Sequence, residues 1–377
     1  RRYGLEVDPT SLIEDLKVSA QQRVEILKML YREAEILIFD EPTAMLTPQE
    51  IEFLLQIIRN LRDGGKTIIL ITHKLEEIKQ VADRCAVLNR GKLVGMLDVA
   101  NTTTKEMARM MVGRDITFEI EKPPAQFGEP VLQVDKLTVE NENKFDVVKN
   151  VSFAIRKGEI FAIAGVAGNG QVEIADAIAG LAKIKTGSIK LNGQDISQYR
   201  VRKRNEAGIA YIPEDRQDVG LILDFTLCEN LALKKYYAPP FSKGMLLKQN
   251  VMDEYAAQLI EKYDIRSGSG ATAMRSISGG NQQKAIIARE VELDADFLIF
   301  VQPTRGLDIG AITNIRERMI AERNRGKAIL LISLELDEIM GCADTIGVVY
   351  NGEMLRISPA DQIGMHEVGE YMMGVKN

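Results

Sequence analysis

The sequence predicts an α/β fold that is built twice along one chain, each time as a mostly parallel sheet flanked by helices. Residues 16–113 align without a gap on residues 277–374 at a constant offset (277 − 16 = 261), which indicates an internal repeat. Short apolar runs alternate with helical segments, as they do in parallel sheets whose crossovers are helices. One apolar run also leads directly into a glycine-rich turn and a helix.

Composition places the chain among globular proteins. Its 377 residues are 45% apolar, which allows two cores of ordinary domain size. The formal net charge is −6. Apolar runs such as Ile36–Phe39 are too short to span a bilayer. Lys and Arg are dispersed, which argues against a nucleic-acid-binding face. The three cysteines have no metal-ligand spacing, and no signal-peptide pattern occurs in the sequence, so we expect a reducing cytoplasm as the simplest compartment.

The repeat and the prolines divide the chain into three segments. Residues 1–113 are the first copy, residues 114–130 carry three prolines and predict a linker, and residues 131–377 are the longer second copy. The first residue is Arg1, and the first copy has no counterpart of residues 131–261. We therefore expect the first domain to be incomplete and the chain to be truncated at its N-terminus.

The second copy predicts a definite order of elements. Two alternating apolar segments, VLQVDKLTV and VSFAIRKGEIFAIAG, predict strands that lead to the glycine-rich turn. The pattern then predicts a helix from about Val172, a hairpin at Asn192 and Gly193, a largely helical stretch over 229–264, strand 297–301, a helix from Ile309, strand 328–333, a helix from Leu336, strand 346–350, and a turn at Asn351 and Gly352.

The glycine-rich turn has the frame of a phosphate-binding loop. Residues 165–172 (GVAGNGQV) follow the spacing of GxxxxGK[ST], in which backbone N–H groups surround phosphates, a lysine reaches the outer phosphates and a hydroxyl binds Mg²⁺. Here the lysine position is glutamine and the hydroxyl position is valine. Because such a turn also serves simply to pack a strand against a helix, the motif alone leaves both interpretations open. The candidate phosphate contacts are Gly165, Gly168, Asn169, Gly170, Gln171 and Val172.

In the first copy, a predicted strand ends in acidic residues. The run ILIF is followed by Asp40, Glu41, Pro42 and Thr43, and the next strand ends in His73. In phosphate-loop ATPases such an aspartate holds Mg²⁺ through water and the glutamate activates the attacking water. We therefore predict Asp40 as a metal ligand, with Glu41 and His73 as catalytic residues.

The second copy has lost each of these three groups. Val301, Gln302 and Leu334 occupy the equivalent positions, and none of them carries a carboxylate or an imidazole that could hold the metal through a charge or act as a general base. The sequence therefore predicts catalytic chemistry in the first copy only.

A serine and two glycines open a predicted helix in the second copy. The segment SISGGNQQK, residues 276–284, would place N–H groups and a hydroxyl at a helix N-terminus, where a terminal phosphate can bind. An ordinary N-cap at Ser278 explains the same pattern. The first copy has lost the serine and glycines, and Lys17 stands among their replacements. The candidate residues are Ser278, Gly279, Gly280 and Asn281.

These motifs, in this order, resemble the nucleotide-binding domains of ABC transporters. The resemblance covers essentially the whole chain and implies two tandem P-loop NTPase domains, each with a helical subdomain, that use ATP and Mg²⁺. The fused halves, with PED at residues 213–215 where a glutamine is usual, are similar to the ATPase subunits of carbohydrate-type importers, which adds Glu214 to the nucleotide-binding candidates. Residues 21–26 and 41–50 most resemble the purine-nucleoside subgroup, with the monosaccharide (ribose or galactose) subgroup as the alternative.

The resemblance also implies that the two halves pair head to tail, with each ATP between one half's phosphate loop and the other half's signature. One composite site then joins the acidic strand end of the first copy to residues 278–280 and is competent, and the other is degenerate. Lys17, where the family usually has a serine, either contacts a phosphate or faces solvent.

Partners and location follow from the same resemblance. We expect integral-membrane permease subunits and, indirectly, an extracellular substrate-binding lipoprotein, with no nucleic acid, at the cytoplasmic face of a bacterial cell membrane. The expected activity is ATP hydrolysis that drives import of purine nucleosides or simple sugars, although this chain alone should be inactive. A permease-free tandem ABC protein acting on ribosomes or DNA is the rival, and Gln302 and the proline-bearing linker argue against it.

Overall fold

The sequence repeat is also a repeat of secondary structure. Strand β1 (Ile36–Asp40) matches β13 (Phe297–Val301), and helix α2 (Pro48–Asp63) matches α10 (Ile309–Asn324), at the offset of the sequence alignment. The remaining pairs are α1 (Val18–Tyr31) with α9 (Gly279–Val291), β2 (Thr67–Ile71) with β14 (Ala328–Ile332), α3 (Leu75–Val81) with α11 (Leu336–Cys342), β3 (Arg84–Asn89) with β15 (Thr345–Tyr350), β4 (Lys92–Asp98) with β16 (Glu353–Pro359), and α4 (Thr104–Val112) with α12 (Met365–Met372).

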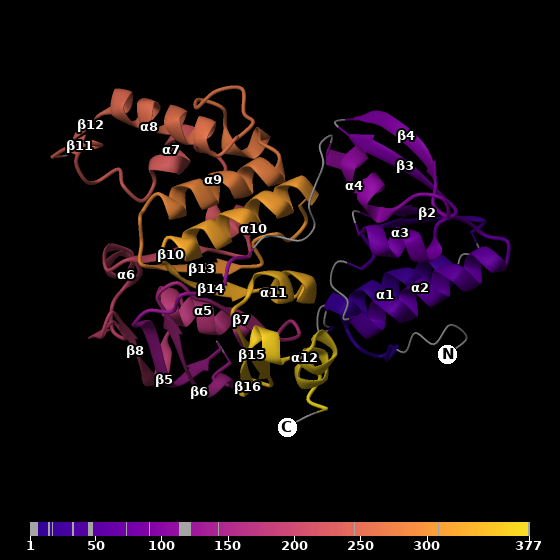
Figure 1. Ribbon diagram of the computed structural model, residues 1–377, viewed down its shortest axis with the longest axis horizontal. Coiled ribbons are helices and arrows are strands. Elements are labelled where there is room, and N and C mark those ends of the chain that lie inside the picture. Colours follow the sequence, from indigo (N-terminus) through magenta and orange to yellow (C-terminus); the bar gives the residue numbers. More distant parts are fainter. Residues whose placement is uncertain are drawn as a thin grey trace. The chain divides into compact units, whose positions relative to one another are not determined.

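The computed structural model forms two units, which Figure 1 shows in sequence colours. Unit 1 contains residues 1–118 and 308–310, and unit 2 contains residues 119–307 and 311–377. The structure describes residues 7–13, 16, 18–31, 34–43, 48–72, 74–89, 91–112, 122–141, 143–244, 246–307 and 309–375.

Among the described residues of unit 2, a six-stranded sheet forms the centre. Its order is β10–β13–β14–β7–β15–β16, and every neighbouring pair is parallel except β15 with β16. The predicted mostly parallel sheet is therefore confirmed, and β13 has the predicted bounds. The two strands not yet given are β7 (Ile160–Ala164) and β10 (Ile209–Ile212).

Both faces of this sheet are covered. Leu298 and Leu331 point to one side and join a core with residues of α9, α10 and α11, while Ile299 and Leu330 point to the other side and pack with α5 (Gln171–Ala179). Because neither face meets water, β13 is apolar at every position and buries all of them.

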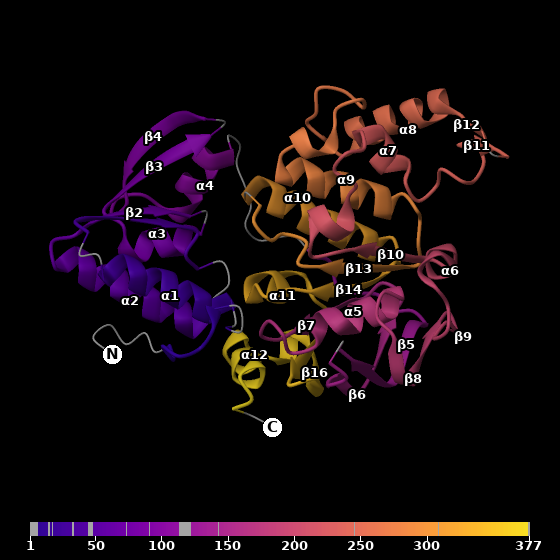
Figure 2. The ribbon, with the colours of Figure 1, turned by 180° about the vertical axis from the view of Figure 1, so that it is seen from behind.

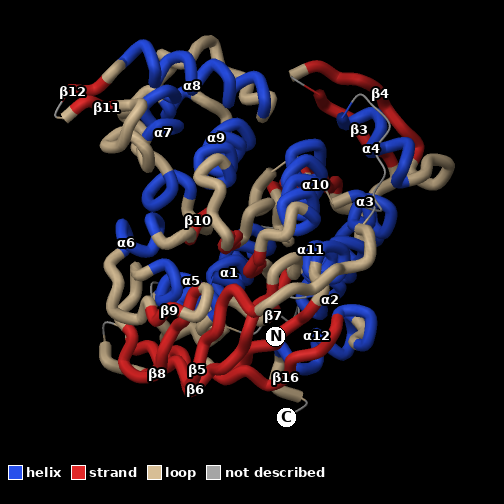
Figure 3. The backbone as a smooth tube through the Cα atoms, turned by 60° about the vertical axis from the view of Figure 1, so that its left-hand side comes forward, coloured by secondary structure: helices blue, strands red, loops and turns tan. Residues whose placement is uncertain are grey.

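A second sheet covers the α5 side, in addition to the single sheet that the sequence predicted. Its antiparallel order is β6–β5–β8–β9, and it lies at the opposite end of unit 2 from α7 and α8 (Figures 2 and 3). The predicted hairpin is confirmed: Asn192 and Gly193 join β8 to β9 with φ of 47° and 78°, as a two-residue turn of this type requires. The strands are β5 (Pro130–Glu140), β6 (Asp146–Arg156), β8 (Ile184–Leu191) and β9 (Gln194–Asp195).

The stretch over 229–264 is helical with an interruption. Helices α7 (Leu227–Ala232) and α8 (Gln249–Lys262) flank a small antiparallel pair, β11 (Ser242–Lys243) with β12 (Leu246–Leu247). No helix in the described part of the chain combines the length and apolar character needed to cross a membrane. The short helical elements of unit 2 are α6 (Val201–Glu206), a π-helical turn (Arg216–Gly220), and 3₁₀ turns at Met274–Ser276 and Ala360–Gln362.

Unit 1 has two separate two-stranded sheets among its described residues. Strand β1 pairs in parallel with β2, and β3 pairs antiparallel with β4. In unit 2 the counterparts of β2 and β3 are both hydrogen-bonded to β7, which lies between them.

The β1–β2 sheet is covered on one face only. Leu37 packs with residues of α1 and α2, whereas Ile36 and Ile38 are 61% and 59% exposed. Their counterparts in unit 2, Phe297 and Ile299, are fully buried. The difference arises because no described element of unit 1 occupies the place that α5 and the antiparallel sheet occupy in unit 2.

The described part of the predicted linker is attached to unit 2. Lys122 forms an ion pair with Asp344 at 3.4 Å, and the carbonyl oxygen of Pro123 accepts a hydrogen bond from Arg323 at 2.8 Å. Pro130, which the sequence assigned to the linker, is the first residue of β5. Residues 114–121 lie outside the described residues.

A buried arginine joins α5 to α6. Arg204 is 2% exposed, and its guanidinium donates to the carbonyl oxygens of Ala177 and Ile178 at 2.6 Å and of Tyr199 and Ser197 at 2.9 Å. Two of these acceptors belong to the last turn of α5, where carbonyls lack partners within the helix. Burial lowers the pKa of Arg204, although the Asp195 carboxylate opposes this effect.

We expect Arg204→Met to destabilise unit 2 by about 2–4 kcal/mol, because it leaves buried carbonyl oxygens unpaired. Arg202→Met on the same helix is the control. Arg202 is exposed and pairs with Glu206 at 3.0 Å, a contact worth less than about 1 kcal/mol. Chemical denaturation of both variants measures the difference, and equal losses would contradict the assigned role.

Candidate functional site

The predicted phosphate loop lies between β7 and α5. Helix α5 begins one residue before the predicted position, with Gly170 as its N-cap at φ 103°. A Cβ atom at Gly170 would lie 2.5 Å from the carbonyl oxygen of Val147, so both the conformation and the space require glycine. The loop is held by the turn after β15, because Gly352 donates its N–H to the carbonyl oxygen of Asn169 at 3.0 Å.

Gln171, at the lysine position of the motif, turns back onto the loop. Its Nε2 donates to the carbonyl oxygen of Val166 at 3.0 Å, and the residue is 4% exposed. The side chain lies so close to Gly165 that a Cβ atom there would clash with it. The amide therefore serves the loop's own backbone and brings no positive charge to it.

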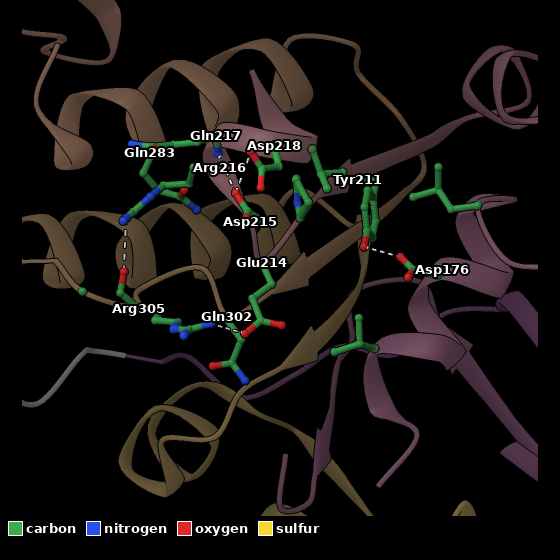
Figure 4. Close-up of a pocket in the computed structure, with 15 residues that line it drawn as sticks. Asp176, Tyr211, Glu214, Asp215, Arg216, Gln217, Asp218, Gln283, Gln302 and Arg305 are labelled. Atoms are coloured by element: carbon green, nitrogen blue, oxygen red, sulfur yellow. Dashed lines mark hydrogen bonds and ion pairs between the residues drawn. The ribbon is translucent and has the colours of Figure 1, made fainter. Parts of the chain in front are cut away.

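A cavity of about 880 Å³ adjoins this loop in unit 2. It extends from Val172 and Asp176 of α5 past the end of β10 to the segment that follows β13. Figure 4 shows Asp176, Glu214 and Arg305 around it. Acidic and basic side chains both line it. The charged residues in its wall are Asp176, Glu214, Asp215, Arg216, Asp218 and Arg305.

An ion pair crosses the cavity wall. Glu214, two residues after β10, pairs with Arg305, and Arg216 donates to the Arg305 carbonyl oxygen at 3.1 Å (Figure 4). Arg216 also lies beside the glycine that opens α9, since a Cβ atom at Gly279 would be 3.5 Å from its Nη2. Burial, aided by repulsion from Arg305, lowers the pKa of Arg216. Three segments distant in sequence thus meet at this guanidinium.

The strand end of β13 carries no acidic side chain. Val301 is fully buried, and Gln302 is 7% exposed with φ 50°. The side-chain oxygen of Gln302 accepts a hydrogen bond from the backbone N–H of Leu334 at 3.2 Å. The backbone N–H of Gln302 donates to the carbonyl oxygen of Ile332 at 2.8 Å. Gln302 therefore ties together the ends of β13 and β14.

Unit 1 places Glu41 in the same backbone geometry. Glu41 has φ 45°, and its N–H donates to the carbonyl oxygen of Ile71 at 2.9 Å. Asp40 is exposed at the last position of β1, and Pro42 and Thr43 are buried. The two copies thus share the strand-end conformation and differ in the side chains that it presents.

The predicted signature segment opens α9, and Ser278 is its N-cap residue. An ordinary N-cap side chain accepts a hydrogen bond from a backbone N–H of the first helical turn, but the Ser278 side chain does not. Instead, Oγ of Ser278 accepts a hydrogen bond from Nδ2 of Asn281 at 2.9 Å. Oδ1 of Asn281 in turn accepts a hydrogen bond from the backbone N–H of Arg266 at 2.8 Å. Asn281 therefore holds the serine hydroxyl in a fixed position at the exposed end of the helix.

A buried acid supports the strand that leads to Glu214. Oε2 of Glu290 accepts the Tyr211 N–H at 3.1 Å and Nζ of Lys234 at 2.6 Å, and Oε1 accepts Nε of Arg289 at 2.9 Å. Burial would raise the pKa of Glu290, but Lys234 and Arg289 outweigh it and hold the pKa below its ordinary value. The Tyr211 hydroxyl donates to Asp176 at 2.6 Å, and burial raises the pKa of both side chains.

The structure places some predicted site residues and leaves others undescribed. It brings Val172, Glu214 and Gln302 to one cavity. His73 and Lys17 lie outside the described residues. Arg216 and Arg305 were not predicted from the sequence, although Arg216 directly follows the PED segment at residues 213–215 and Arg305 lies three residues after Gln302.

Comparisons with known proteins identify the family of the chain. A sequence profile described as ABC transporter matches residues 148–305. The chain is 49% identical to the nucleoside import ATP-binding protein NupA of Lactococcus lactis subsp. cremoris (strain MG1363), over 99% of this chain and 74% of that protein. It is 47% identical to the guanosine import ATP-binding protein NupO of Bacillus subtilis (strain 168), over 99% of this chain and 73% of that protein.

Solved structures support the fold. The ADP conformation of MJ1267, an ATP-binding cassette of an ABC transporter, matches with a TM-score of 0.53 at 19% identity, over 65% of this chain and 96% of that one. At this identity the likeness concerns the fold alone.

The Glu290 contacts predict a dependence of stability on pH. Because the folded-state pKa of Glu290 is lowered, its stabilisation is complete above the unfolded-state value of about 4.5 and is lost as pH falls through the folded-state pKa. We expect Glu290→Gln to be less stable than the parent at pH 7, and this difference to shrink at acidic pH. Urea denaturation across that range measures it, and a constant difference would refute the assignment.

Proposed function

The chain belongs to the family of ABC transporter ATP-binding proteins, and from this premise we propose that it energises import of purine nucleosides, with ATP hydrolysis confined to the site of Glu41. The composite arrangement expected from the family resemblance is part of the proposal: the signature at Ser278 completes the competent site, and the site of Gln302 is degenerate. Tandem P-loop domains, the first of them incomplete in residues 1–113, are also part of it.

One observation carries the proposal: the ends of β1 and β13 have the same backbone conformation but present different side chains. Glu41 and Gln302 have φ of 45° and 50° and donate equivalent N–H bonds to the neighbouring strand. Since the frame is the same, the residue at this position decides whether a base is present. A carboxylate can take a proton from water, whereas an amide cannot.

In unit 1, the proposed roles of Asp40 and Glu41 differ: Asp40 is the metal ligand and Glu41 is the general base. Glu41 would accept the proton of the water that attacks the terminal phosphate. The exposed Asp40 carboxylate fits Mg²⁺, a cation that proteins bind through one or two carboxylates together with substrate phosphates. Among the described residues, no cluster of three or more acids, histidines or cysteines could hold a metal. When bound, Mg²⁺ neutralises charge on the phosphates.

In unit 2 the same positions do not fit Mg²⁺, because the buried Val301 offers no oxygen ligand. Gln171 adds no charge to the phosphate loop, and its amide already serves that loop. We propose that this site acts as a structural clamp with negligible turnover. Lack of a general base alone costs about 10²–10⁴ in rate.

The substrate class and the partners are proposed from the relatives. The nucleoside and guanosine importers named above support purine nucleosides, and a ribose- or galactose-type monosaccharide importer is the second candidate. The proposed partners are integral-membrane permease subunits and, indirectly, an extracellular substrate-binding lipoprotein. The proposed location is the cytoplasmic face of the bacterial membrane.

Two matched substitutions test the division of labour in the complete protein. Glu41→Gln should lower ATP turnover by at least about 10²-fold, because it removes the base. Gln302→Glu should leave turnover within about twofold, because the base returns to a site without a metal ligand. Steady-state phosphate release measures both. Strong residual turnover in Glu41→Gln would falsify the assignment.

Uptake in cells that lack the protein tests the solute. Entry of a radiolabelled purine nucleoside should fall to background while ribose entry persists. The parent should restore nucleoside entry and Glu41→Gln should not, because transport needs hydrolysis. Loss of ribose entry with intact nucleoside entry would favour the monosaccharide alternative.

A further inference from the structure

A buried glutamate lies behind the acidic strand end of unit 1. Glu77, on α3, has a side chain that is 5% exposed. Its Oε1 accepts the Thr43 hydroxyl at 2.6 Å, and its Oε2 faces the Thr72 hydroxyl at 3.3 Å. Thr43 is two residues after Glu41, and Thr72 directly follows β2. Glu77 therefore joins the two segments that leave the ends of β1 and β2.

These contacts close a ring around Glu41. On the strand side, the Glu41 N–H donates to the carbonyl oxygen of Ile71 at 2.9 Å. On the far side, Thr43 and Thr72 both contact Glu77. Since Glu41 has a left-handed φ of 45°, a conformation that non-glycine residues avoid, its backbone needs such support from the surrounding structure.

The position of Glu77 is an unfavourable place for a carboxylate. Burial raises its pKa, opposed by the Thr43 hydroxyl, by Lys74 at 4.0 Å and by Thr72, while the charge of Glu41 raises the pKa further. An apolar residue of similar size would avoid this cost. Compared with an apolar residue, a carboxylate at this position adds hydrogen bonds to the segments that follow β1 and β2.

Unit 2 provides the matched comparison. Glu338, Thr304 and Ser333 occupy the positions of Glu77, Thr43 and Thr72. Neither carboxylate oxygen of Glu338 makes a hydrogen bond of normal length within the described chain, and the nearest cation, Arg316, is 3.7 Å away. Burial raises the pKa of Glu338 more than Arg316, Ser333 and Thr304 lower it. Glu338 thus faces the same two hydroxyl positions, but hydrogen bonds of normal length to the carboxylate are made only around Glu77, in the unit that keeps Glu41.

We propose that Glu77 is a positioning residue for hydrolysis, which holds the backbone of Glu41 through Thr43 and Thr72. This inference rests on the proposed role of Glu41 as the base. Glu77 itself does not touch the nucleotide. Its loss should therefore slow the chemical step and leave nucleotide affinity nearly unchanged, because a small misplacement of a catalytic group costs rate rather than binding.

The test compares Glu77→Leu with Glu338→Leu in the complete protein. Leucine removes the polar contacts and keeps the core apolar and filled. Glu77→Leu should lower kcat for ATP at least about tenfold with KM within about twofold, and Glu338→Leu should leave kcat within about twofold. Thr43→Val and Thr304→Val form a second, gentler pair with the same expected contrast, should a leucine variant fail to fold. Glu77→Gln, which keeps one acceptor oxygen, should recover part of kcat.

The outcomes separate this inference from the function on which it rests. Equal effects of the paired substitutions in the two units, or a change confined to KM, would overturn the positioning role. If Glu41→Gln is inactive while Glu77→Leu and Thr43→Val keep full kcat, only the positioning inference is wrong. If Glu41→Gln keeps full turnover, the assignment of the base is wrong and the inference falls with it.

Discussion

The convergence of parallel strands at one edge of a sheet is the constraint on which the candidate site depends. Glu41 and Gln302 each follow such a strand, adopt a left-handed φ and bond through N–H to the neighbouring strand. This backbone conformation sets the direction of the residue's own side chain, whether that side chain is a carboxylate or an amide. The frame could therefore persist while its chemistry changed from a carboxylate to an amide.

The same frame serves two different purposes in the two units. In unit 1 the strand end presents Asp40 and Glu41, and the hydroxyls behind it are tied to Glu77. In unit 2 the amide of Gln302 is used within the fold, since its oxygen accepts the N–H of Leu334. Likewise Gln171 bonds to the loop that a lysine would leave free for phosphates. Where a catalytic group is absent, its replacement stabilises the scaffold.

The cavity of unit 2 depends on contacts between distant segments. Glu214 and Arg305 pair across it, and Arg216 reaches the Arg305 backbone and lies near Gly279. A segment after β10, the start of α9 and the segment after β13 are thereby held together. Arg216 and Arg305 are therefore the residues through which these three segments contact one another.

The sequence by itself determined the elements and the local chemistry of the strand ends. Apolar periodicity, glycines and turn residues act over a few neighbours, so β13, α10, α11 and the Asn192–Gly193 hairpin appear where the patterns predicted them. The gapless repeat likewise located the loss of the acidic pair in the second copy.

Only the tertiary structure decided which of these residues meet. It divided the predicted strands of unit 2 between two sheets, folded Gln171 onto its own loop, paired Glu214 with Arg305, and buried Glu77 against Thr43. The Gln171 contact joins residues close in sequence, but the other contacts join residues tens of positions apart. Their contact is set by the packing of whole elements, and no local pattern of the sequence encodes it.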